Sequence, residues 1–138
     1  MIVPEIISGN KHSDDRGSLI YNNSFNAALV KRIYFIENRN ISFVRGWQGH
    51  KIEQRWFSAV SGEFEISLIK IDNWQTPSKL LPQLKFLLDD QQFSVLHIPG
   101  GYITSIKALS DCSKLMVMSD YLLNEIEDEY RFEIDYFK

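Results

Sequence analysis

The sequence predicts an all-β domain of the sandwich or barrel type, and three observations support this. Many short segments rich in β-branched and aromatic residues recur along the chain at fairly regular spacing. Clusters of turn-forming residues separate them. Helical periodicity is almost absent. The nine Phe, six Tyr and three Trp among 138 residues agree with this prediction, because aromatic side chains favour strands and sandwich cores.

The strongest strand signal is Glu63–Leu68, where polar and apolar residues alternate strictly. Ser61-Gly62 precedes it and predicts a hairpin turn from a strand over Gln54–Val60. The other predicted strands are, in chain order, Ser18–Asn22, Lys31–Glu37, Phe43–Trp47, Leu84–Leu88, Ser94–Ile98, Tyr102–Leu109 and Lys114–Tyr121. Turn clusters are expected at Ser8-Gly9-Asn10, Asn38-Arg39-Asn40, Asp89-Asp90 and Pro99-Gly100-Gly101.

The acidic end of the chain is the one exception to the β pattern. Leu123–Phe132 predicts a turn or two of helix with a solvated charged face. Aromatic residues continue beyond it, which indicates that the tail docks on the body of the protein; they are Tyr130, Phe132, Tyr136 and Phe137.

Length and charge narrow the functional classes. The 138 residues fit one domain, residues 1–138. A net charge of −3 without a basic stripe argues against a nucleic-acid partner. No signal peptide and no membrane span are evident, so we expect a cytoplasmic protein without a membrane partner. The single cysteine, Cys112, excludes an intrachain disulfide and is interpreted as an inert thiol in a reducing compartment.

Three segments could carry chemistry, and the first surrounds Arg16. In Asp15-Arg16-Gly17, a glycine turn holds an arginine that could present its guanidinium to a phosphate. The alternative is a turn arginine in a surface ion pair, which is the commoner situation for such a residue taken alone.

The second segment runs from Val44 to Lys51. Residues two apart in a strand share a face, so Gln48 and His50 should point the same way, joined by Gln54 and Trp56 from the next stretch. A polar row facing into an otherwise apolar barrel would form a pocket. The alternative for a lone histidine is a hydrogen-bonded structural residue.

The third segment, Leu96–Thr104, contains the sharp corner Pro99-Gly100-Gly101. Tyr102 and Thr104 share one face of the strand that follows. His97 lies between two apolar residues, so we interpret it as a packing residue rather than a catalyst.

These segments, taken in order with several others, resemble a known family. Lys31-Arg32-Ile33-Tyr34, Arg45-Gly46 to Lys51, Ser61-Gly62, Ile98-Pro99-Gly100-Gly101 and Met118-Ser119-Asp120-Tyr121 occur between Asp15-Arg16-Gly17 and Tyr130-Arg131. In this order they resemble the dTDP-sugar 3,4-ketoisomerases (WxcM-like sugar isomerase domains) and, more distantly, the dTDP-4-dehydrorhamnose 3,5-epimerases. The resemblance covers nearly the whole chain, and it depends on the co-occurrence of the motifs rather than on any one of them.

The resemblance implies a cupin or jelly-roll fold and a homodimer that exchanges or pairs strands. It also implies a pocket for a nucleotide-linked keto-sugar in deoxysugar and surface polysaccharide biosynthesis. The chemistry would move a proton next to a carbonyl, which needs a base and a donor for the developing oxyanion.

Residue by residue, the resemblance assigns roles to four positions. Arg16 matches the arginine of the family's D-x-R-G motif and would contact the diphosphate. Tyr34 matches the pocket tyrosine and would be the acid. Arg45 matches the arginine before the pocket histidines, and His50 matches the second histidine of the H-x-H-K motif and would be the base. The expected substrate-binding residues are Arg16, Arg45, Gln48, Gln54, Tyr102 and Thr104.

The sequence departs from the family at the positions that bear most on catalysis. Gln48 replaces the first histidine of the motif, and an amide has no useful basicity at neutral pH. Thr104 stands where the epimerases carry a later histidine, and the epimerase acid tyrosine corresponds to Met116 or a neighbour. One imidazole, His50, and one carboxylate, Glu53, make a poor metal site, so no metal and no cofactor are expected.

Three hypotheses therefore follow. The first is a nucleotide-sugar isomerase or epimerase of the 3,4-ketoisomerase type that uses His50. The second is a non-catalytic module that binds the nucleotide sugar but has lost the base. The third is an interaction domain of a glycan-assembly enzyme.

Overall fold

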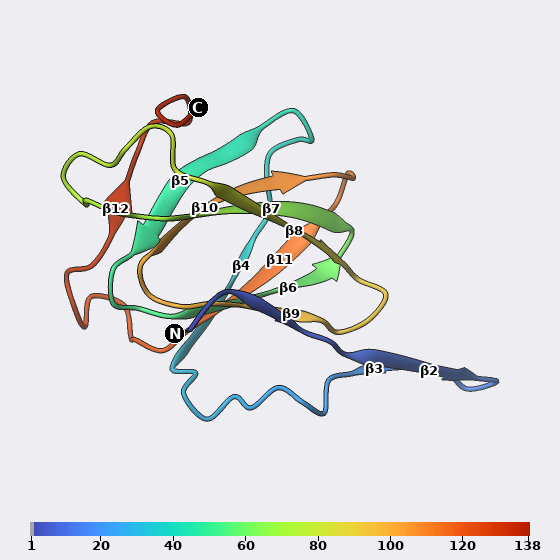
Figure 1. Cartoon of the computed structure of the whole chain (residues 1–138). Coiled ribbons are helices and arrows are strands. Elements are labelled where there is room, and N and C mark those ends of the chain that lie inside the picture. Colours follow the sequence, from blue (N-terminus) through green and yellow to red (C-terminus); the bar gives the residue numbers. More distant parts are fainter. Residues whose placement is uncertain (1) are drawn as a thin grey trace.

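Two five-stranded antiparallel sheets face each other and enclose the core in the computed structural model, which describes residues 2–138 (Figure 1). The first sheet has the order β1-β9-β6-β11-β4. Its strands are β1 (Glu5–Ile7), β9 (Val95–Ile98), β6 (Arg55–Ser61), β11 (Lys114–Ser119) and β4 (Arg32–Ile36).

The second sheet has the order β12-β5-β10-β7-β8. Its strands are β12 (Tyr130–Arg131), β5 (Val44–His50), β10 (Tyr102–Ala108), β7 (Glu63–Lys70) and β8 (Gln83–Asp89). The predicted all-β sandwich and each of the nine predicted strands are confirmed. The turn expected at Ser61-Gly62 is present, with Gly62 at φ 72°, a conformation that favours glycine. The predicted hairpin is wrong, because β6 pairs with β9 and β11 whereas β7 pairs with β8 and β10, so this turn joins the two sheets.

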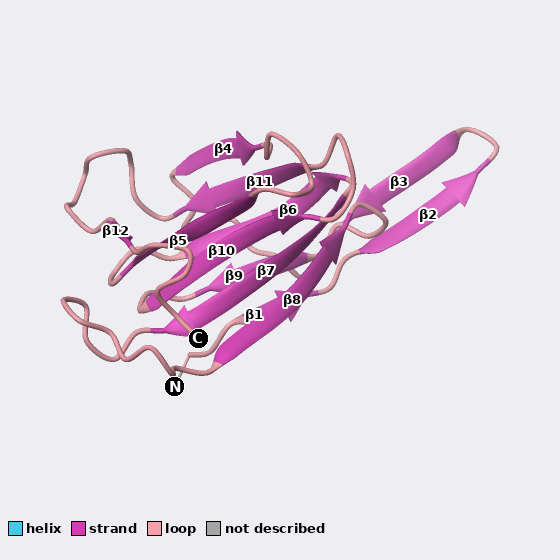
Figure 2. Ribbon diagram, turned by 90° about the horizontal axis from the view of Figure 1, so that it is seen from above, coloured by secondary structure: helices cyan, strands magenta, loops and turns pink. Residues whose placement is uncertain are grey.

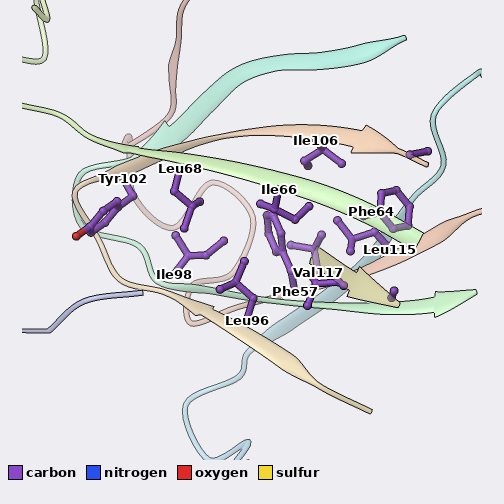
Figure 3. Packing of buried hydrophobic residues seen from close by; sticks show 13 residues of the cluster. Phe57, Phe64, Ile66, Leu68, Leu96, Ile98, Tyr102, Ile106, Leu115 and Val117 are labelled. Carbon is purple, nitrogen blue, oxygen red and sulfur yellow. The ribbon is translucent and has the colours of Figure 1, made fainter. Parts of the chain in front are cut away.

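The core lies between the sheets and comes from the inward positions of both (Figure 3). Two-residue alternation places apolar side chains inward along each strand. The fully buried members include Phe57, Phe64, Ile66, Leu68, Leu96, Leu115 and Val117.

The C-terminal tail docks on the body of the protein, as predicted, and it packs against the outer face of the second sheet. Trp47, on β5, packs against Phe137 with ring centroids 5.5 Å apart. The Tyr136 hydroxyl donates a hydrogen bond to the Pro77 carbonyl at 2.6 Å. The tail thereby holds β12 along β5, where Tyr130 pairs with Gly49 and Arg131 with Gln48.

The prediction of a helical turn over Leu123–Phe132 is wrong. This segment forms no helix, and strand β12 lies near its end. A single turn forms instead, in which the Glu125 amide donates to the Leu122 carbonyl at 3.1 Å. Asn124 has φ 64°, in the left-handed region, so a right-handed helix cannot continue through it. No helix that could cross a membrane occurs among residues 2–138.

A third sheet has two strands, β2 (Asn10–Asp14) and β3 (Gly17–Tyr21), and projects from the body as an arm (Figure 2). Nearly all of its side chains are exposed, including the apolar Leu19 and Ile20. Together with β1 and β12, strand β2 is one of the three strands that the sequence pattern did not predict.

Candidate active site

A small cavity opens where β4 of the first sheet and β5 of the second sheet border the interior of the sandwich. Its volume is about 190 Å³. Strands β4, β5, β6, β10 and β12 contribute its polar side chains, which are Tyr34, Arg45, Gln48, Arg55, Thr104 and Arg131. Four of these, Tyr34, Arg45, Gln48 and Thr104, are among the residues expected from the sequence.

Strand alternation explains why the cavity is polar. On β5, Gln48 pairs with Thr104 of β10 in the antiparallel register, so their side chains share a face. On β6, Arg55 precedes Phe57 and Ala59 at alternating inward positions that otherwise fill the apolar core. The polar end of each strand therefore lies at the cavity, and the apolar part continues into the core.

Gln48 and Arg131 connect the cavity to a wider groove. The Gln48 amide nitrogen donates to a carboxylate oxygen of Glu129, and the Arg131 guanidinium contacts the same oxygen at 3.4 Å. A groove of about 760 Å³ runs between β5 and the C-terminal segment, and it shares Arg45, Gln48 and Arg131 with the cavity. The two arginines are exposed and stand at the junction.

His50 is buried two residues beyond Gln48, with both ring nitrogens in contact. Its Nδ1 lies 2.9 Å from the Asp128 carbonyl oxygen, which can only accept, so Nδ1 carries a proton. Its Nε2 lies 3.3 Å from the Glu53 carboxyl. Burial, and secondly the charge of Arg55, lower the pKa of His50 to about 4. His50 is therefore neutral at pH 7, with the unprotonated Nε2 facing Glu53.

Glu53 is buried beside three basic groups. One of its carboxyl oxygens lies 3.8 Å from Arg32 Nη2 and has no hydrogen-bond partner within the described part of the chain. Burial raises the pKa of Glu53, although hydrogen bonding by Ser119 and the charges of Arg32 and Arg55 act in the opposite sense.

Asp128 fixes the loop that joins His50 to Glu53. Its carboxylate accepts hydrogen bonds from the backbone amides of Lys51, Ile52 and Glu53 at 3.0, 2.8 and 2.8 Å. The same residue thus holds the histidine through its carbonyl and the loop through its side chain.

Of the row of four residues expected to face one pocket, Gln48 lines the cavity, whereas His50, Gln54 and Trp56 do not. The loop after His50 reverses the direction of the chain. Trp56 therefore lies on the outer face of the first sheet, where its ring stacks on that of His97 with the ring centroids 5.4 Å apart. His97 Nε2 is 2.8 Å from the Gln54 amide oxygen, which agrees with a packing role for this histidine. Gln54 is therefore not part of the cavity.

Two other expected residues lie away from the cavity. Tyr102 is buried at one end of the core (Figure 3) and borders a separate apolar cavity beside Ile71 and Leu81. Burial raises the pKa of its hydroxyl. Arg16 is at the tip of the arm, where its side chain is 85% exposed and pairs with Asp14 at 2.8 Å.

The sequence reasoning missed Arg55, Asp128, Glu129 and Arg131. Arg55 had a usable signal, because it alternates with Phe57 and so belongs to the inward face of its strand. The other three lie in the segment that was predicted as a helical turn, and only long-range pairing with β5 brings them to the site. Within residues 2–138, no three His, Cys, Asp or Glu side chains gather as a metal would require.

Comparisons with known proteins agree with this architecture. A family model described as "FdtA: WxcM-like, C-terminal" matches residues 4–138. Among solved structures, a 3,4-ketoisomerase from Helicobacter canadensis is 25% identical, covers 91% of this chain and 88% of its own, and has a TM-score of 0.69. A search of curated proteins finds no match.

Two further structures share the fold at lower identity. A mutant of the 3,4-ketoisomerase QdtA from Thermoanaerobacterium thermosaccharolyticum, in complex with TDP-4-keto-6-deoxyglucose, is 19% identical over 99% of this chain and 92% of its own, with a TM-score of 0.73. The 3,5-epimerase RmlC from Legionella pneumophila, in complex with dTDP-4-keto-L-rhamnose, is 16% identical. The match covers 94% of this chain and 72% of the epimerase, with a TM-score of 0.71. The expected jelly-roll type of fold is thereby confirmed.

Proposed function

The chain belongs to the WxcM-like, C-terminal (FdtA) family, and from this premise we propose that it is a nucleotide-sugar isomerase of the 3,4-ketoisomerase type. Its substrate would be a dTDP-4-keto-6-deoxyhexose, and its product would enter cytoplasmic deoxysugar synthesis for surface glycans. The observation that carries the proposal is the polar cavity between the sheets, where Tyr34, Gln48, Arg55 and Thr104 converge from four strands.

The charges at the cavity suit a nucleoside diphosphate. Arg45 and Arg131 stand at the junction of the cavity and the wider groove, and a guanidinium binds phosphate oxygens bidentately. The diphosphate would bind at this junction, with the nucleoside in the groove. The sugar would then enter the cavity and contact Gln48 and Thr104.

A 3,4-ketoisomerisation needs proton transfers only. The C3–H bond breaks and its electrons form the C3–C4 double bond, while the C4 carbonyl becomes an enediolate oxygen. The oxygen on C4 then takes up a proton, the O3 proton is lost, and a second proton reaches C4, so the ketone is at C3 and a hydroxyl is at C4. Carbon 3 has been oxidised and carbon 4 reduced without an external cofactor.

We assign the base to His50 and the acid to Tyr34. The neutral imidazole has a lone pair on Nε2, and Glu53 at 3.3 Å could stabilise the imidazolium that forms when a proton arrives. Tyr34 lines the cavity and carries a phenolic proton that could be donated to the sugar.

A second candidate function, a nucleotide-sugar-binding module without turnover, is favoured by the contacts of His50. Asp128 and Glu53 occupy both ring nitrogens, and His50 is not among the residues that line the cavity. Gln48, which does line it, cannot act as a base at neutral pH.

One experiment separates the two functions. The protein is incubated with dTDP-4-keto-6-deoxyglucose in D2O, and the sugar ring protons are followed by NMR. Loss of the C3 proton signal, or a new keto-sugar, is expected for the isomerase, and His50→Asn should reduce this rate at least 100-fold while leaving the circular dichroism spectrum unchanged.

The contrary outcomes are distinct. Line broadening of the ligand without exchange would favour the binding module, whereas neither binding nor exchange would favour the interaction domain. His97→Asn is the matched control, because this histidine packs on the outer face of the first sheet; its exchange rate should match that of the unmodified protein.

We also propose that the protein acts as a homodimer, which the arm supports. An isolated two-stranded hairpin is at best marginally stable in water, yet β2 and β3 project from the body with Leu19 and Ile20 exposed. Packing of the arm on a second copy would cover these side chains. It would also carry Arg16 to the partner, where it could contact the diphosphate as the family resemblance implies.

A further inference from the structure

Arg55 is a buried cation in the wall of the cavity. It is 4% exposed, and its guanidinium lies 5.1 Å from the centre of the Phe57 ring. Its Nη2 donates to the Thr104 hydroxyl oxygen at 3.4 Å and to the Gln48 backbone carbonyl at 3.5 Å. Both acceptors are neutral, and both hydrogen bonds are long.

No carboxylate among residues 2–138 lies within 4.0 Å of the Arg55 guanidinium. The one carboxylate whose charge acts on it is that of Glu53, among the residues that the structure describes, and this carboxylate already faces His50 at 3.3 Å and Arg32 at 3.8 Å. Tyr34 also acts on Arg55, but it offers a phenolic hydroxyl and not a carboxylate. A buried charge is costly unless it is paired, so this guanidinium is preorganised for a negative charge that the cavity receives.

The three arginines of the cavity lie at different depths. Arg45 and Arg131 are exposed at the junction with the groove, whereas Arg55 contacts the fully buried Thr104. Among residues 2–138, no Asp or Glu lines the cavity. If the two outer arginines bind the diphosphate, Arg55 is therefore the arginine that can contact the sugar.

We propose that Arg55 is a further catalytic residue, which binds the negative charge that develops on the sugar carbonyl oxygen. This inference rests on the proposed function. When the C3–H bond breaks and its proton moves to the base, the π electrons of the C4 carbonyl move onto oxygen. The Arg55 guanidinium keeps its own proton and donates hydrogen bonds to that oxyanion, which is stabilised strongly because the site is buried. A base of modest strength can then remove the C3 proton, although Gln48 replaces one histidine.

The test compares Arg55→Gln and Arg55→Lys with Arg39→Gln, an exposed arginine that serves as the matched control. NMR in D2O gives the exchange rate of the C3 proton at saturating dTDP-4-keto-6-deoxyglucose, and calorimetry gives the dissociation constant of dTDP. Arg55→Gln should lower the exchange rate about 100- to 1000-fold and change the dTDP constant less than about threefold. Arg55→Lys, which keeps the charge but loses the planar fork, should be intermediate.

A second measurement is independent of turnover. The dissociation constants of dTDP-glucuronate and dTDP-glucose are compared, because the carboxylate places a full negative charge on the sugar. The unmodified protein should bind the glucuronate at least about tenfold more tightly, a difference expected for one desolvated charge pair. In Arg55→Gln this ratio should fall to about one.

The outcomes of these measurements support or overturn the assignment of Arg55. Exchange by Arg55→Gln within tenfold of the unmodified rate overturns the proposal, and so does an equal loss of dTDP affinity, which would make Arg55 a diphosphate ligand. If the unmodified protein does not exchange the C3 proton, the proposed function fails. A preference for dTDP-glucuronate that depends on Arg55 would then still support the assignment of Arg55 to negative charge on the sugar. Equal affinities for dTDP-glucuronate and dTDP-glucose would overturn this assignment. If Arg55→Gln does not fold, as judged by thermal unfolding, Arg55→Lys decides by the same measurements.

Discussion

His50 Nε2 and a carboxyl oxygen of Glu53 face each other, and the groups around them decide which of the two can donate a hydrogen bond. The Asp128 carbonyl requires the proton on Nδ1, so Nε2 is left as an acceptor. The Glu53 oxygen 3.3 Å away can donate only when the carboxyl is protonated. Burial disfavours the charged form of both groups, which is why the pKa of His50 falls and that of Glu53 rises.

The lowered pKa of His50 predicts a pH dependence of stability. In the unfolded chain this histidine takes up a proton below about pH 6.5, but in the folded protein only below about pH 4. The unfolded state binds more protons in this window, so the contribution of His50 to the free energy of unfolding is complete above pH 6.5 and is lost as the pH falls to 4. The raised pKa of Glu53 acts in the opposite direction, because its contribution is lost as the pH rises.

The comparison of unmodified protein with His50→Asn isolates the histidine. The difference between their free energies of unfolding should narrow by roughly 3 kcal/mol between pH 6.5 and pH 4, at about 1.4 kcal/mol for each pH unit. Urea unfolding at a series of pH values measures it. A difference that stays constant with pH would mean that His50 titrates normally in the folded protein.

At the scale of the element, β5 is the strand on which the site depends. It pairs with β10 on one side and with β12 on the other, and it carries Gln48 and His50 on its inner face. Gly49, between them, allows the close approach of β10. A Cβ at Gly49 would overlap with the Tyr102 carbonyl oxygen and the Ile103 Cα, and both are backbone atoms that cannot easily move.

Gly49→Ala should therefore lower the free energy of unfolding by about 2–3 kcal/mol and weaken dTDP binding, because the register of Gln48 against Thr104 shifts. Gly46→Ala on the same strand is the control: the three atoms nearest to its Cβ would all belong to Ile134, at ordinary contact distances of 3.5 Å and more. Chemical denaturation and calorimetry measure both effects. Equal stabilities of the two variants would contradict the close approach of β10.

The strand pattern explains which elements could be predicted from the sequence. Glu63–Lys70 alternates because one face is buried, and the buried face specifies both the strand and its register. Asn10–Asp14 has no buried face in the monomer, so alternation leaves no signal there. Tyr130–Arg131 is too short for a pattern, and only its pairing with β5 makes it a strand.

The same reasoning applies to the site. Gln48 and Thr104 could be predicted because they lie on regular strands, where alternation fixes the face, whereas Tyr34 was expected from the family resemblance. Gln54 was misplaced because the Lys51–Glu53 loop, held by Asp128, reverses the direction of the chain after His50. A loop held by a carboxylate from 75 residues away leaves no mark in the local sequence.

At the scale of the whole molecule, the arm predicts how two copies associate. If Leu19 and Ile20 pack on a second copy, then Leu19→Asp should bury a charge in that contact and shift the protein from dimer to monomer. Sedimentation velocity at micromolar concentration measures the change. Leu80→Asp, which replaces a loop leucine that is 77% exposed, should leave the dimer intact.

A monomeric unmodified protein would contradict the dimer proposal. A Leu19→Asp variant that remains a dimer would place the interface elsewhere on the molecule, away from the arm.

The strand order of the first sheet also has a consequence for the speed of folding. β1 lies beside β9, and β4 lies beside β11, so neither edge strand pairs with its neighbour in sequence. Such distant pairings require large loops to close before any contact forms, and proteins built from them fold in milliseconds to seconds. The β2–β3 hairpin needs only local contacts and can form in microseconds. During refolding the arm can therefore begin to form while β1 and β4, the edges of the first sheet, are still unpaired. Refolding at high protein concentration should then lose material to aggregation.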